Sequence, residues 1–484
     1  MTIARANLRL AIVLTLLLTL LPAAATATAA SAVPTVTVER VQAPGTRMLG
    51  ASAVDLKARG YVEQEYYVSG RASRYRMAGA ADASIVDRGW PYVTRIVVRK
   101  PARSQRFNGT VVVEWNNVTG GQDIDFSWAA SHDHLMREGY AWVGVTAQRV
   151  GVEQLRRWSP QRYGRLTVDA SNTDPATGGL LEPPAWPYAG GDVLAWDIFS
   201  QVGRTLRTHA AAQDPLAGLG VRRLIANGQS QSAGRLTAYY NSIQRLHGVY
   251  DGFVYYDGAG ALRDDISVPA VSMESEWLNG TQRDPAATPQ DTAYSRHWEV
   301  AGTSHIALDD ARYVDAMVLR DGSLLAPDNT PVTLTGLIRD CQYQPLWSNV
   351  PNGLVLNAAF DHVNTWIRGG PAAPRAPRFE RDLNASPATL KRDDSGQVLG
   401  GIRPPQFAVP TAAVRASNLG PGFCTLAGHH RFYSREELRQ RYGNHGRYVS
   451  KVATAAATAR YAGFLLPEDA NAIIRKAAAS DVGR

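Results

Sequence analysis

The sequence predicts an α/β protein built on a doubly wound, mainly parallel sheet with helices on both faces. The main observation is an alternation along the chain, in which short β-rich apolar runs are separated by segments of helical period. Such alternation is typical of strand–helix–strand units, whose parallel strands are covered on both faces. Composition agrees with this, because 45% of the 484 residues are hydrophobic and only 19% are charged. The chain therefore has ample material for a large core.

The predicted strands are recognised by their length and their β-branched or aromatic content. Seven runs qualify: residues 92–98, 110–115, 141–145, 223–226, 253–256, 268–273 and 298–301. Helical period fills several of the intervals, as in Val193, Trp196, Phe199 and Val202, which are spaced three or four residues apart. In an open parallel sheet, ligands bind beyond the carboxyl ends of the strands. Functional residues are therefore expected where these runs end.

Two stretches do not follow the alternation. Residues 150–190 form a long stretch that is polar and rich in Pro and Gly. Loops of this length in a compact domain are usually functional. We predict a lid-like insertion there, whose aromatic residues are candidate walls of a pocket: Trp158, Tyr163, Trp186 and Tyr188. Residues 370–484 begin Pro-rich and end with helical period, which indicates a C-terminal extension packed on the core. Residues 33–484 are then expected to form a single domain.

Residues 1–32 have the pattern of a secretory signal peptide. Arg5 and Arg9 precede an apolar run from Leu10 to Leu21, and a stretch of small residues with Ala-x-Ala sites follows. The apolar run is too short to span a bilayer comfortably, and no other run approaches that length. We therefore expect a secreted or periplasmic protein that is soluble and not stably inserted in a membrane.

The predicted export of the protein bears on the oxidation state of its cysteines. The chain contains only Cys341 and Cys424, and an oxidising compartment favours their pairing. We predict one disulfide, which would tie the C-terminal extension to the body of the protein. Two buried free thiols are the alternative.

The charge pattern does not indicate a nucleic-acid partner. The net charge of +8 arises from 46 Arg and 5 Lys scattered among 43 acidic residues, without the clustering that such a surface requires. Arginines near a pocket would, however, favour an acidic or uronate-like substrate. No P-loop or dinucleotide fingerprint is present, and no His-Glu pair of a metallopeptidase motif occurs. We therefore predict no cofactor and no metal.

A candidate nucleophile follows the fourth predicted strand. The sequence there is Gly228-Gln-Ser-Gln-Ser-Ala-Gly234, followed by a helical segment. A strand, a tight turn with serine at its apex, and a helix form a nucleophile elbow. The usual pattern is G-x-S-x-G, and both Ser230 and Ser232 lack one of its glycines. Because the apolar strand stops at Asn227-Gly228, the sharp turn falls on Ser230, and Ser232 is the alternative.

A serine hydroxyl needs a base that a third group orients. His305 follows the last predicted strand in the sequence Gly302-Thr-Ser-His, which suits a base on a loop beside the elbow. Glu274 and Glu276 follow the strand before it and alternate along an extended segment, so that only one can point at the histidine. We predict Glu276 as the acid, with Glu274 as the alternative.

The oxyanion that forms during acyl transfer also needs hydrogen-bond donors. We expect one donor to be the backbone N–H of Gln231, which follows the nucleophile, and the second to come from the loop after residues 110–115. That loop reads Asn116-Asn-Val-Thr-Gly-Gly121, and Asn117 or Asn116 is the candidate.

Taken together, these stretches resemble the α/β-hydrolase superfamily, and in particular its large secreted branch of α/β hydrolase domain-containing proteins. The resemblance covers nearly the whole mature chain and is carried by residues 111–118, 139–145, 228–234, 299–305 and 400–404. It implies a serine hydrolase with Ser230, an acid and His305, but no particular substrate. We expect a carboxylesterase-like enzyme that acts on a small-molecule or polymer-borne ester. A peptidase or amidase with the same triad, or a non-catalytic binding protein, are the alternatives.

Overall fold

The computed structural model describes residues 33–182, 191–209, 211–282, 289–326, 328–386 and 388–484. The predicted signal peptide, residues 1–32, lies outside these ranges. Nine strands form one sheet, which runs in the order β1 (Thr37–Arg40), β2 (Tyr61–Ala78), β3 (Ala81–Pro101), β5 (Ala141–Val145), β4 (Thr110–Trp115), β6 (Arg223–Gln229), β7 (Gly252–Tyr256), β8 (Ala270–Ser275) and β9 (Ser295–Val300). Each of the seven predicted strand runs overlaps a strand of this sheet.

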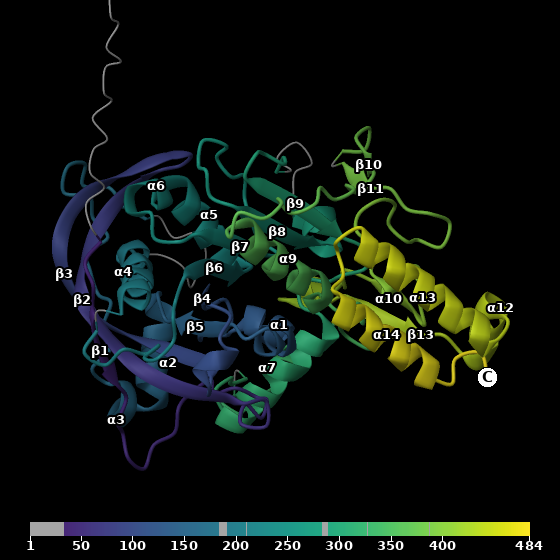
Figure 1. The fold of residues 1–484 in the computed structure, drawn as a ribbon, viewed down its shortest axis with the longest axis horizontal. Helices are drawn as coiled ribbons and strands as arrows, with labels where there is room; N and C mark the ends of the chain where they lie inside the picture. Colours follow the sequence, from purple (N-terminus) through teal and green to yellow (C-terminus); the bar gives the residue numbers. More distant parts are fainter. Residues whose placement is uncertain (1–32, 183–190, 210, 283–288, 327, 387) are drawn as a thin grey trace, which may run out of the picture.

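The sheet has a parallel part and an antiparallel part. Strands β5, β4, β6, β7, β8 and β9 are parallel neighbours, whereas β1, β2 and β3 are antiparallel, and β3 joins β5 antiparallel. The long hairpin of β2 and β3 curves along the edge of the molecule opposite the C-terminal helices (Figure 1). The mainly parallel sheet of the predicted fold class is confirmed, but the sequence reading placed no strand before residue 92.

Helices cover both faces of the sheet because its strands present apolar residues on both sides. In β4, Val111 and Val113 pack into a core with α2 (Arg149–Trp158), α3 (Pro160–Tyr163), α4 (Ala195–Thr208) and α5 (Gln231–Ser242). Val112 faces the opposite side, where the core includes α1 (Phe126–Arg137), α7 (Leu308–Asp321), α8 (Leu334–Leu337) and α9 (Gly353–Trp366). This arrangement is what continuous apolar strands of a doubly wound sheet require.

The segment after α9 adds further short elements. They are β10 (Arg381–Asp382), β11 (Thr389–Leu390), α10 (Pro405–Ala408), β12 (Ala412–Arg415), α11 (Cys424–Ala427), β13 (His429–Phe432), α12 (Arg435–Tyr442), α13 (His445–Tyr461) and α14 (Pro467–Ala479), with α6 (Gln244–His247) the remaining short helix of the core. Asn357 of α9 donates a hydrogen bond to the Asp469 carboxylate of α14 at 3.0 Å. Helices α13 and α14 lie side by side at the end of the molecule away from the β2–β3 hairpin (Figure 1).

The predicted disulfide is present. Cys341 and Cys424 are bonded, with their Cα atoms 5.3 Å apart, across 83 positions of sequence. The bond attaches α11 to the segment that follows α8, so part of the C-terminal region is tied covalently to the body of the protein.

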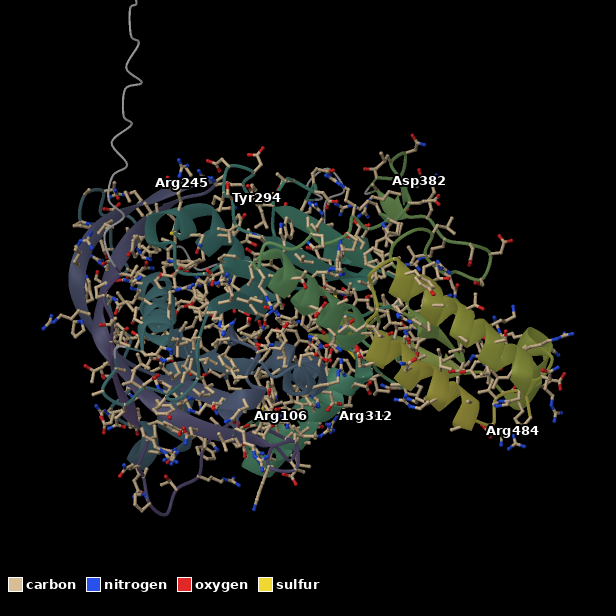
Figure 2. All side chains as sticks on the ribbon, viewed as in Figure 1. Arg106, Arg245, Tyr294, Arg312, Asp382 and Arg484 are labelled. Atoms are coloured by element: carbon tan, nitrogen blue, oxygen red, sulfur yellow. A yellow bond between two sulfur atoms is a disulfide. The ribbon has the colours of Figure 1, made fainter. Side chains whose placement is uncertain are left out.

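The arginines are distributed widely. Arg245, Arg312 and Arg484 project from separate parts of the surface (Figure 2), while Arg95 and Arg99 are buried and paired with carboxylates. Among the helices of the described ranges, none is both long and apolar enough to cross a membrane.

Candidate active site

Ser230 occupies the sharp turn between β6 and α5. Its backbone has φ 58° and ψ −121°, a positive φ that is uncommon for a residue with a side chain. The turn is held by a hydrogen bond from Ser230 N–H to the carbonyl of Tyr256 in β7, at 2.9 Å. Gly258 is required beside it, because a Cβ there would lie 2.4 Å from the Ser230 carbonyl oxygen. The strained turn of the predicted elbow is thus built from two adjacent strand ends.

Ser232 explains how the turn departs from the usual glycine pattern. This residue is fully buried, and its hydroxyl donates to the Gln229 carbonyl at 2.8 Å while accepting from Gln229 N–H at 3.0 Å. Ser232 occupies the position of the second glycine in the usual G-x-S-x-G pattern. Its small side chain stabilises the turn there through these two hydrogen bonds to Gln229. Ser230, and not Ser232, lies beside the predicted histidine.

His305 lies between Ser230 and a carboxylate. Its Nε2 is 2.7 Å from Ser230 Oγ, and its Nδ1 is 2.5 Å from Asp257 Oδ2. Asp257 is fully buried and directly follows β7, and it also accepts from the backbone N–H and the hydroxyl of Ser275. The indole of Trp277 packs against the imidazole, with ring centroids 4.4 Å apart. Serine, histidine and aspartate therefore form one continuous hydrogen-bonded chain.

The acid predicted from the sequence is corrected by this geometry. Glu276 accepts from the Gly302 N–H at 2.8 Å and pairs with Arg392 at 2.8 Å, so it holds the loop before His305 instead of touching the imidazole. Glu274 points elsewhere, to Ser272 at 3.1 Å and to His297 at 3.4 Å. Both glutamates belong to β8 or its end, whereas the carboxylate that reaches His305 comes from β7, the immediate neighbour of the elbow strand.

Asp257 had a signal in the sequence that the strand-end argument could have used. It directly follows the apolar run 253–256 and precedes Gly258, just as Ser230 follows its own strand in a turn of small residues. Its positive φ of 52° marks a second tight turn at the same edge of the sheet.

The oxyanion prediction is only partly compatible with the geometry. Gln231 is the first residue of α5, so its N–H has no partner within the helix, and the residue lines the same cavity as Ser230 and His305. Asn117, in contrast, is fully engaged. Its backbone N–H and carbonyl both bond Ile124, and its side-chain amide donates to the carbonyl and the side-chain oxygen of Gln229. Asn117 thus fastens the loop to the elbow strand, and its donors are not directed at a substrate. Asn116 donates its N–H to Val145.

A buried network of hydrogen bonds holds the loop that carries His305. Asp310, at the start of α7, accepts from the Tyr256 hydroxyl at 2.6 Å and from Ala307 N–H at 3.1 Å. Asn352 bridges this carboxylate to the carbonyl of Ser304. Burial raises the pKa of the Asp310 carboxyl to about 6, against the hydrogen bonds that lower it.

This raised pKa gives a prediction for stability. The ordinary pKa is 3.8, so the contribution of Asp310 to stability is complete below that pH and is lost as pH rises to about 6. An asparagine at 310 does not titrate. Between pH 4 and pH 7, the free energy of unfolding of Asp310→Asn should therefore rise relative to that of wild type by about 2 kcal/mol. Urea unfolding at the two pH values measures this change, and an equal difference at both would contradict the assignment.

A cavity of about 800 Å³ opens at Ser230 and His305. Its walls include Ser230, His305 and Gln231, and most of the remainder is hydrophobic. Within the predicted lid-like insertion, Leu181 and Glu182 line it. Trp158 and Tyr163 do not: Tyr163 is buried against Glu65, and Trp158 bonds the Asp321 carbonyl. Trp186 and Tyr188 lie outside the described residues.

The described part of the chain contains no group of three or more His, Cys, Asp or Glu arranged to hold a metal ion.

Comparison with known proteins gives the following matches. Residues 27–475 match a family model described as an alpha/beta hydrolase domain. No curated protein matches the chain. The solved structures that are similar in part include a mutant of the esterase Est22 (12% identity, 46% of this chain, 67% of that chain, TM-score 0.25), a glucuronoyl esterase from Solibacter usitatus (9%, 52%, 71%, 0.28) and a putative acetyl xylan esterase from Bacteroides fragilis (13%, 61%, 69%, 0.27).

Proposed function

Because the chain belongs to the alpha/beta hydrolase domain family, we propose that it is a serine hydrolase that cleaves carboxylic esters through an acyl-enzyme. The observation that carries this proposal is the continuous chain from Ser230 Oγ through His305 to Asp257, at 2.7 and 2.5 Å. That constellation recurs on unrelated folds and is recognised by its geometry and roles. The cavity of about 800 Å³ at Ser230 supports a small-molecule substrate.

Each residue has a defined task in this mechanism. Ser230 Oγ attacks the carbonyl carbon of the ester while His305 Nε2 takes the hydroxyl proton. Asp257 accepts the Nδ1–H, which fixes the tautomer of the imidazole and stabilises the imidazolium that forms. The Gln231 N–H, at the positive end of α5, donates to the developing oxyanion. Collapse of the tetrahedral intermediate breaks the bond to the alcohol, which receives the proton from His305.

The second half-reaction repeats these roles with water. His305 takes a proton from water, the resulting oxygen nucleophile attacks the acyl carbon, and the carboxylic acid leaves as Ser230 regains its proton. The buried positions of Asp257 and His305 keep the competing solvent from weakening their hydrogen bond.

Hydrolysis of p-nitrophenyl butyrate and of the corresponding p-nitroanilide tests this proposal directly. We expect release of p-nitrophenol with an initial burst of one equivalent per Ser230 if deacylation is slow, and much slower release of p-nitroaniline. Equal rates on both substrates would favour the amidase alternative. Activity on neither would favour a non-catalytic binding protein.

We further propose that the protein is exported. The support is the charged, apolar and small-residue pattern of residues 1–32 and the disulfide between Cys341 and Cys424, a bond that persists in oxidising compartments. Fractionation of the producing cells, with detection of the mature N-terminus in the exported fraction, tests this. Recovery of the full-length chain from the cytoplasm alone would contradict it.

A further inference from the structure

The walls of the catalytic cavity are mostly hydrophobic. The apolar side chains come from both cores and from the segment around Cys424: Phe126, Trp196, Ile338, Trp347, Phe423 and Leu426. A cavity of this size and lining suits a ligand with a large hydrophobic part. Burial of such a part would supply most of the binding energy, because apolar surface leaves water on both sides of the contact.

The charged groups on the described part of the wall neutralise one another. Arg235, in the second turn of α5, pairs with Glu182, and it also lies 3.3 Å from a carboxylate oxygen of Asp192. Its side chain is 11% exposed and lies over the Trp196 ring. With two carboxylates already beside this guanidinium, a third carboxylate from a substrate would be buried without a free cation. The sequence-based expectation of an acidic or uronate-like ester is therefore not supported by this arginine.

One wall is supplied by the C-terminal region. The segment 422–426, which includes the start of α11, lines the same cavity as Ser230 and His305. The disulfide fixes Cys424 to Cys341, and Thr425 Oγ1 accepts a hydrogen bond from the Trp277 indole at 3.0 Å. Trp277 is the residue that packs on His305. Phe423 and Leu426 are thus carried by a segment that is attached at two points, by the disulfide and by the hydrogen bond from Trp277.

From these observations we propose that Phe423 and Leu426 determine substrate specificity, and that the site accepts neutral esters whose large hydrophobic group packs against this disulfide-tied wall. The inference rests on the proposed function, since it names the substrate class of the same site. It assigns to the C-terminal region a direct part in substrate selection.

Truncation of the wall tests the proposal with two esters that differ only in chain length. For Phe423→Ala and Leu426→Ala, we expect kcat/KM for p-nitrophenyl octanoate to fall about tenfold or more through a higher KM. The kcat/KM of both variants for p-nitrophenyl acetate should stay within about twofold of the wild-type value, because the short acyl group does not reach the wall. Leu419→Ala is the matched control: Leu419 is 57% exposed, is absent from the lining of the cavity and lies shortly before this segment in the sequence. It should change neither value.

A second pair of substrates isolates charge from size. The p-nitrophenyl ester of valeric acid and the mono-p-nitrophenyl ester of glutaric acid have acyl chains of equal length, but the second carries a free carboxylate. We expect wild type to prefer the neutral ester by about tenfold or more in kcat/KM, because the carboxylate would lose its hydration without gaining a cation.

The outcomes separate this inference from the proposed function. If wild type cleaves p-nitrophenyl acetate and Ser230 reacts with a fluorophosphonate, the proposed function stands. An octanoate-to-acetate ratio that is the same in wild type and in both wall variants, or a preference for the glutarate half-ester, would then overturn the inference alone. A wild-type protein without any esterase activity would overturn both.

Discussion

Replacing Ser230 by alanine is expected to lower kcat for p-nitrophenyl butyrate by about 10⁶-fold, the scale seen when a serine hydrolase loses its nucleophile. The physical reason is that the hydroxyl of Ser230, 2.7 Å from His305 Nε2, has no substitute. Among the described residues, no other hydroxyl forms a hydrogen bond with this nitrogen. The residual rate would come from substrate binding and the Gln231 N–H alone. Steady-state kinetics at substrate saturation measure this effect.

Ser232→Ala is the control for that variant. Ser232 has the same side chain two positions away, but its hydroxyl bonds only to the backbone of Gln229. We expect a loss of stability of about 1–2 kcal/mol from the broken hydrogen bonds, and kcat within about tenfold of wild type. A larger loss of activity in Ser232→Ala than in Ser230→Ala would show that the wrong serine has been assigned.

Replacing Asp257 by asparagine is expected to lower kcat by about 10⁴-fold with little change in KM, as an equivalent change does in another serine hydrolase. The carboxylate accepts from His305 Nδ1 at 2.5 Å and from the N–H and hydroxyl of Ser275. An asparagine at 257 cannot accept all three, and it can turn its NH₂ towards Nδ1. The imidazole would then hold its proton on Nε2, where it cannot remove a proton from Ser230.

Glu276→Gln is the matched control for this prediction, because sequence reasoning placed the acid there. Its carboxylate bonds Gly302 N–H and Arg392 and does not contact His305. We expect kcat to stay within about tenfold of wild type, with a modest loss of stability. If Glu276→Gln loses more activity than Asp257→Asn, the assignment of the acid from this geometry is wrong.

The parallel part of the fold could be predicted because its strands are continuous apolar runs. Strand β2 and the part of β3 before residue 92 could not, because charged residues interrupt their apolar pattern. Glu65 of β2 is buried against Arg95 and Arg162, and Arg74 is buried against Asp87. A charge inside a strand indicates an exposed face unless its partner is known, and these partners lie 13 to 97 residues away in sequence.

Only part of the candidate site could be predicted, again because some of its contacts join residues that lie far apart in the sequence. Ser230 directly follows β6, and His305 lies on the loop that follows β9, so the rule that ligands bind at strand ends is enough to single them out. Choosing between Asp257 and Glu276 required the spatial order of β6, β7 and β8, which local pattern does not contain. Asn117 is predicted from its loop and its residue type, and only the structure shows that Ile124 and Gln229 occupy its hydrogen-bonding groups.

Covalent labelling with a fluorophosphonate, followed by peptide mapping in a mass spectrometer, tests the central claim most directly. The reagent reacts only with a serine whose proton is removed by a neighbouring base. The account predicts one adduct per chain, located on Ser230, which is lost in Ser230→Ala and strongly slowed in Asp257→Asn. An adduct on Ser232, or a folded wild-type protein that takes no label, would contradict it.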